Sequence, residues 1–168
     1  MKNHSGLLAV VALATLIAGC GRNNEEAGEA ADQAPLPTAA TLGDQVIMTA
    51  SGYLQSEPYA SASLSRGERQ AQWCKACHSL EKGGPHMIGP ALHGFFGTEV
   101  GTRSGFAYSE AMREADFVWT PAAVDAWLAQ PGRFLPGNRM TFAGVADADD
   151  RNDLIAYLLE VTSADGAD

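Results

Sequence analysis

The chain has 168 residues, which is enough for one compact domain and a terminal extension. Its 20 acidic residues outnumber its 11 basic ones, and the resulting net charge of −9 argues against nucleic-acid binding, which needs a basic surface. The 18 glycines and 8 prolines predict a fold rich in loops, and three cysteines are too few, and odd in number, for a disulfide framework.

The first 20 residues predict export and lipid attachment. One lysine precedes an apolar run from Leu7 to Ile17, which is shorter than the ~20 residues that a membrane-spanning helix needs. The following Ile17-Ala18-Gly19-Cys20 resembles the lipobox of bacterial lipoproteins. This resemblance implies that residues 1–19 are a signal peptide and that Cys20 carries acyl chains such as palmitate, which anchor the mature chain. The alternative is cleavage elsewhere, with Cys20 incidental.

Residues 20–63 are expected to form the lipidated N-terminus and a flexible tether. From Gly21 to Thr41 the composition is dominated by Asn, Glu, Ala, Asp, Gln and Pro, with no apolar periodicity. Such a stretch buries too little apolar surface to offset its conformational entropy. Residues 45–54 are more apolar, and the sequence leaves open whether they pack on the domain.

The remaining residues, 64–168, predict a single all-α domain, since no stretch has a convincing strand pattern. Thr120 followed by Pro121 is typical of a helix start, with Thr as the N-cap and Pro at the first helical position. Residues 79–106 contain seven glycines and are expected to be loops. The expected helices cover residues 66–73, 106–114, 121–129 and 149–162.

The sequence Cys74-Lys75-Ala76-Cys77-His78 is a C-x-x-C-H motif, the attachment signal for haem c. Two thiols at this spacing can form thioethers with the two vinyl groups on one porphyrin edge, and the next residue brings an imidazole to the iron. A thioredoxin-like pair would need a βαβ pattern, and a zinc site would need a second pair of ligands; the sequence has neither. We therefore expect one covalent haem c per chain.

An electron-transfer haem needs a sixth ligand, and methionine is a common one. Met1 lies in the leader and Met48 in the expected tether. Met87 follows the motif closely, Met112 lies in an expected short helix, and Met140 lies in the turn-rich segment 136–144. For any single methionine the alternative is core packing.

From about Gly67 to the last helix, some 95 residues, the chain resembles class I cytochromes c of the small mitochondrial and bacterial type. The motifs that carry the resemblance occur in the family's order and spacing. They are the C-x-x-C-H motif, Glu81-Lys-Gly-Gly84, Gly89-Pro-Ala-Leu-His-Gly94, Gly105-Phe-Ala-Tyr108, Trp119, Pro136-Gly-Asn-Arg-Met-Thr-Phe-Ala-Gly144 and Asp153-Leu-Ile-Ala-Tyr-Leu158.

The resemblance implies a class I cytochrome c fold, a few helices and long loops around one haem, and a role for each matching residue. Three positions depart from the family pattern: Thr98 replaces an arginine near the propionates, Met112 replaces an asparagine, and Ala71 replaces an aromatic residue. The implied roles are thioether attachment at Cys74 and Cys77, axial ligation by His78 and Met140, orientation of His78 by the Pro90 carbonyl, and hydrogen bonding of a haem propionate by Tyr108 and Trp119.

The implied function is that of an electron-transfer protein, not an enzyme. We expect a lipid-anchored one-electron carrier in the bacterial cell envelope, on the periplasmic face of a membrane. Its donor would be a quinol-oxidising complex or a dehydrogenase, and its acceptor a terminal oxidase or reductase, in a respiratory or photosynthetic chain. One alternative is a fixed electron-entry subunit of a larger complex. A peroxidase or an enzyme acting on nitrogen oxides is disfavoured because Met140 would close the iron site.

Overall fold

The computed structural model describes residues 38–164. The expected signal peptide, Cys20 and the first part of the expected tether lie outside the described residues. In the described part the chain forms helices and one isolated β-bridge, between Glu99 and Val118, but no strand. The elements are η1 (Ala39–Thr41), α1 (Ala50–Leu54), η2 (Tyr59–Ser61), α2 (Leu64–Lys75), α3 (Glu110–Glu114), α4 (Pro121–Ala129), α5 (Pro131–Phe134) and α6 (Ala148–Thr162). The all-α expectation is confirmed.

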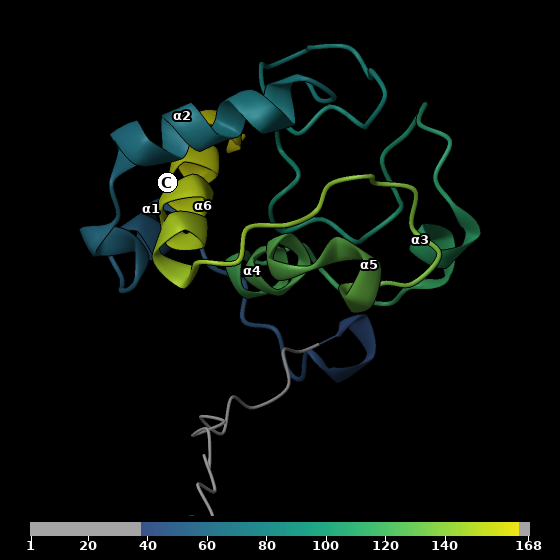
Figure 1. Cartoon of the computed structure of the whole chain (residues 1–168), viewed down its shortest axis with the longest axis horizontal. Coiled ribbons are helices and arrows are strands. Elements are labelled where there is room, and N and C mark those ends of the chain that lie inside the picture. Colours follow the sequence, from purple (N-terminus) through teal and green to yellow (C-terminus); the bar gives the residue numbers. More distant parts are fainter. Residues whose placement is uncertain (1–37, 165–168) are drawn as a thin grey trace, which may run out of the picture. The chain divides into compact units, whose positions relative to one another are not determined.

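Helices α2 and α6 cross in close contact (Figure 1). The crossing depends on small residues of α2: a Cβ on Gly67 would lie 2.1 Å from the Asp153 carbonyl oxygen, and Ala71 is fully buried. The Asp153 carboxylate of α6 accepts hydrogen bonds from the Ser63 backbone N–H at 2.5 Å and from the Arg66 side chain. One buried carboxylate therefore joins the start of α2 to α6.

Helix α4 begins and ends at the expected residues. Thr120 is its N-cap, and the Thr120 hydroxyl accepts a hydrogen bond from the Ala123 N–H at 3.2 Å. Its buried face packs on α6, and its own Trp127 belongs to a group of aromatic rings in edge-to-face contact, with centroids 4.9–5.8 Å apart. These rings belong to Phe117, Trp119, Trp127 and Phe134.

Residues 38–63 differ from the expected flexible tether. They contain α1, which lies beside α6, and their partly buried apolar side chains pack on the core (Figure 1). Tyr53, Leu54 and Tyr59 are among the side chains that make this contact. We call residues 38–63 the N-terminal arm. The sequence left the packing of residues 45–54 open, because a short apolar stretch of this kind does not show by itself what it packs against.

The other differences are at helix ends. Helix α2 begins at Leu64 and runs into the motif, α3 is confined to Glu110–Glu114, and α5, which follows α4 after one residue, was not expected. Four residues are too few to show a periodicity in the sequence. No helix in the described part is long and apolar enough to span a membrane.

Candidate functional site

A cavity of about 550 Å³ lies between the end of α2, the loops that follow it, α4 and the segment around Met140. Its volume is within the range of roughly 300–1,000 Å³ that is typical of cofactor pockets. The seven domain residues to which the sequence assigns a role in haem binding all contribute to its lining. They are Cys74, Cys77, His78, Pro90, Tyr108, Trp119 and Met140.

The two cysteines lie on one turn of backbone at the end of α2. The N–H groups of Cys77 and His78 both donate to the Cys74 carbonyl, at 3.0 and 2.9 Å, so the turn continues past the last helical residue. Both thiols are free, and burial raises the pKa of Cys74 to about 11. A thioredoxin-like cysteine has a lowered pKa instead, so the electrostatics argue against a thiol–disulfide redox pair.

The His78 ring is fixed from two directions. Its Nδ1 donates a hydrogen bond to the Pro90 carbonyl at 2.7 Å, which leaves Nε2 as the nitrogen for a metal. Gly89 packs against the ring, where an added Cβ would lie 2.2 Å from Cε1. Burial lowers the pKa of His78 below its ordinary value, and this favours the neutral form that binds metals.

Two methionines line the cavity, Met112 and Met140. Met140 lies in an irregular segment held by Asn138. The Asn138 amide nitrogen donates to the carbonyls of Leu135 and Pro131, at 2.7 and 3.0 Å, and its oxygen accepts from the Met140 N–H at 2.8 Å. The geometry thus places both thioethers at the cavity and holds the backbone of Met140 through one side chain.

Polar side chains gather near Tyr108 and Trp119. Burial raises the pKa of Tyr108, and the nearby Arg103 opposes this effect. Arg103 also lines the cavity, and its guanidinium donates to the His93 carbonyl at 2.7 Å. Sequence reasoning noted the missing cation at Thr98 but did not find Arg103. Its sequence signal is weak, because an arginine between loop residues usually marks a solvated surface.

The two histidines after the motif differ in their hydrogen bonding. Both ring nitrogens of His86 are engaged, Nδ1 by the Ala91 N–H at 3.0 Å and Nε2 by the Ser104 carbonyl at 2.9 Å. The His93 Nδ1 is buried without a hydrogen-bond partner in the described part. Among residues 38–164, no three His, Cys, Asp or Glu side chains gather as a metal site would require.

Comparison with known proteins gives close relatives. The chain is 44% identical over 104 residues to a cytochrome c of Chlamydomonas reinhardtii, covering 61% of this chain and 93% of the relative. The chain belongs to the class I cytochrome c family. A cytochrome c2 of Blastochloris viridis is 38% identical over 110 residues, covering 66% of this chain and 86% of that one. A cytochrome c2 of Rhodomicrobium vannielii is 33% identical over 119 residues, covering 71% and 90%.

No protein-family model matches the chain. Membership of the family nevertheless makes this cytochrome an electron-transfer protein with one covalently bound haem c. The residues of the cavity fit that group: two free thiols on one turn, an imidazole with one nitrogen left for the iron, two thioethers, and a cluster of hydrogen-bond donors suited to carboxylates.

Proposed function

We propose that the cytochrome is a lipid-anchored one-electron carrier whose haem is attached at Cys74 and Cys77 and ligated by His78 and Met140. The observation that carries the proposal is the single cavity that contains all four side chains. When bound, haem c supplies an iron that alternates between the ferric and ferrous states. The protein then has to attach the group, hold both ligands, exclude water and leave an edge open for a partner.

The assignment of Met140 is tested against Met112, which lines the same cavity. In the oxidised wild-type protein we expect the weak methionine–iron charge-transfer band. Met140→Ala abolishes the band, whereas Met112→Ala keeps it, because the segment held by Asn138 is untouched. Loss of the band in Met112→Ala alone would reverse the assignment. Its absence from the wild type at neutral pH would contradict the methionine ligand altogether.

Three side chains of the cavity are proposed to hold the haem carboxylates: Tyr108, Trp119 and Arg103. A buried carboxylate needs hydrogen-bond donors or a cation. The first two roles follow the family pattern, and Arg103 supplies the charge that Thr98 does not. The Thr98 hydroxyl donates instead to the Phe95 carbonyl at 2.7 Å.

The proposed exit for electrons is an apolar rim formed by Trp73, Ile88 and Phe142, which all line the cavity. Trp73 is 61% exposed and Ile88 81% exposed. Two basic side chains, those of Lys75 and Arg139, are engaged within the chain: the Lys75 ammonium lies 5.8 Å from the Tyr157 ring centroid, and the Arg139 guanidinium donates to the Ala107 carbonyl. We infer a partner that docks through apolar contact more than through opposite charge.

The relatives named cytochrome c2 support redox partners in a respiratory or photosynthetic chain. The proposed donor is a quinol-oxidising complex or dehydrogenase, and the proposed acceptor is a terminal oxidase or reductase. Reconstitution of the full-length protein with an isolated oxidase tests the carrier role. Turnover that rises with added cytochrome supports a mobile carrier, whereas turnover only inside a preassembled complex contradicts it.

The anchor is proposed at Cys20, on the periplasmic face of a bacterial membrane. Mass spectrometry of the mature N-terminus tests it: we expect Cys20 as the first residue with acyl chains attached, and an unmodified Cys20 or another cleavage point contradicts it.

Since the N-terminal arm packs on the domain, only residues 20–37 remain between anchor and fold. These 18 residues span at most about 60 Å, against about 150 Å for residues 20–63. This limit favours a partner in the same membrane.

A further inference from the structure

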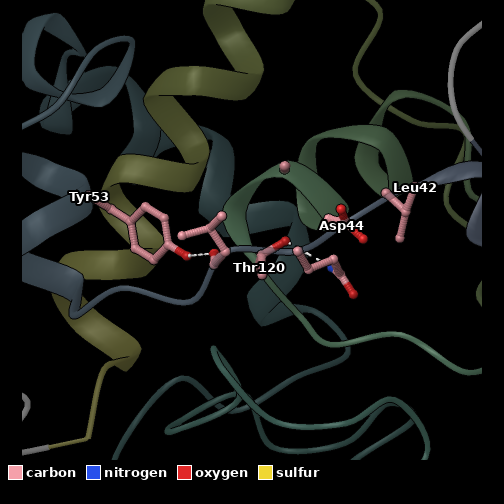
Figure 2. A pocket seen from close by; sticks show the side chains of 7 residues that line it. Leu42, Asp44, Tyr53 and Thr120 are labelled. Atoms are coloured by element: carbon pink, nitrogen blue, oxygen red, sulfur yellow. Dashed lines mark hydrogen bonds between the residues drawn. The ribbon is translucent and has the colours of Figure 1, made fainter.

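The N-terminal arm contacts the segment before α4 through the side chain of Gln45. The Val118 N–H donates to Gln45 Oε1 at 2.7 Å, and Gln45 Nε2 donates to the Val118 carbonyl at 2.6 Å. Gln45 Nε2 also contacts the Thr120 hydroxyl at 3.0 Å, in a second pocket shown in Figure 2. A side-chain amide thus satisfies both backbone groups of one residue, as a neighbouring strand would.

The segment before α4, which contains Val118 and Trp119, also makes backbone hydrogen bonds along its other edge. The Trp119 N–H donates to the Thr98 carbonyl at 2.9 Å, and the Gly97 N–H donates to the Trp119 carbonyl at 3.0 Å. Backbone groups of successive residues therefore point in opposite directions, Val118 toward Gln45 and Trp119 toward residues 97–98. Gln45 completes the bonding of an extended segment whose next side chain, Trp119, lines the haem cavity.

The arm also has internal hydrogen bonds that do not involve Gln45. The Tyr53 hydroxyl accepts from the Met48 N–H at 3.1 Å and donates to the Val46 carbonyl at 2.7 Å. Figure 2 shows Tyr53 and Leu42 at opposite ends of the side chains that line this pocket, with Thr120 between them. These bonds fix the course of the arm but do not contact residues 117–119.

We propose that Gln45 is a positioning residue for the haem site, which fixes the backbone of Trp119 and thereby its indole in the cavity. The N-terminal arm then contributes to the reduction potential although none of its residues lines that cavity. The inference rests on the proposed role of Trp119 at a haem carboxylate. A weaker hydrogen bond to that carboxylate leaves its negative charge less compensated, and this stabilises the ferric state and lowers the potential.

The experiment uses the full-length haem-loaded protein with four substitutions. Gln45→Ala removes the amide, and Gln45→Met removes its hydrogen bonds while keeping its length. Trp119→Phe removes the indole N–H that is being positioned. Tyr53→Phe is the matched control, because it deletes the arm's own hydrogen bonds without contacting Val118. Reduction potential and amide hydrogen exchange at Val118 are measured for each.

We expect both Gln45 variants to lower the potential in the same direction as Trp119→Phe and by less. They also speed exchange at Val118 on the order of fivefold, the effect of one net hydrogen bond, while Tyr53→Phe keeps the wild-type potential. An unchanged potential in the Gln45 variants overturns the inference, and so does an equal shift in Tyr53→Phe or no shift in Trp119→Phe. Failure of the proposed function is separate: it appears as a wild-type protein without the methionine–iron band.

Discussion

The two sides of the haem cavity are held in different ways. On one side, His78 follows a helix, its ring is hydrogen-bonded to Pro90, and Gly89 packs against the ring. On the other side, Met140 lies in a segment without helix, and its backbone depends on the single side chain of Asn138. We therefore expect Met140 to leave the iron before His78 does, since fewer interactions must break on the Met140 side.

The largest expected effect is on the His78 side. Gly89→Ala places a Cβ 2.2 Å from the His78 Cε1, so the ring or the loop has to move. Overpacking of this kind costs about 1–3 kcal/mol, and the displaced imidazole should also leave little haem-loaded protein. Haem content by absorbance and urea unfolding check it.

Gly132→Ala is the matched control, because a Cβ there meets no atom within 4 Å. We expect it to load haem and unfold as the wild type does. If Gly89→Ala matched this control, the His78 side would be no more tightly constrained than the Met140 side, and the comparison would fail.

On the other side, Asn138→Ala is expected to have a smaller effect overall, because it changes ligation of the iron without reducing haem loading. The substitution removes three hydrogen bonds and costs about 1–3 kcal/mol. We expect haem to stay attached while the methionine–iron band disappears at a lower urea concentration. If Asn138→Ala lowered the midpoint for global unfolding without a separate loss of the methionine–iron band, this prediction would be wrong.

Lowering the pH should weaken the contact between α6 and α2, the helix that leads to His78. Burial alone would raise the pKa of Asp153, but the hydrogen bonds from Arg66 and Ser63 outweigh it and lower the pKa. A lowered carboxyl pKa contributes stability that is complete above the unfolded value, about 3.9, and is lost as pH falls through the folded value. Urea midpoints should therefore drop below about pH 4, and Asp153→Asn should lower the midpoint at pH 7 and flatten this dependence.

The smallest expected effect is at the point where the two sides meet. The ring of Trp73, from α2, lies 6.3 Å from that of Phe142, from the Met140 segment. Trp73→Ala should lower the free energy needed to break the methionine–iron bond by about 0.5 kcal/mol, so that the band disappears at a lower urea concentration. Ile88→Ala, also at the exposed rim, is the control and should leave the midpoint unchanged; equal shifts would show that the ring contact contributes nothing.

Much of the fold could be predicted because its signals are local. The start of α4 follows from Thr120, which caps the helix, and from Pro121, whose backbone suits the first helical position. The end of α2 at the motif and the apolar stripe of α6 are similarly visible in short windows of sequence. The packing of residues 38–63 is not, because Tyr53 and Tyr59 are isolated apolar residues whose partners lie about a hundred positions away in α6.

The residues available for haem chemistry can be identified without a structure, since a C-x-x-C-H motif places two thiols and an imidazole on one turn whatever surrounds it. The groups that support them are found only in the folded molecule. The cation at Arg103, the glycine against His78 and the amide of Gln45 on Val118 come from segments far apart in the chain. Their roles depend on distances of a few ångströms, which no local pattern encodes.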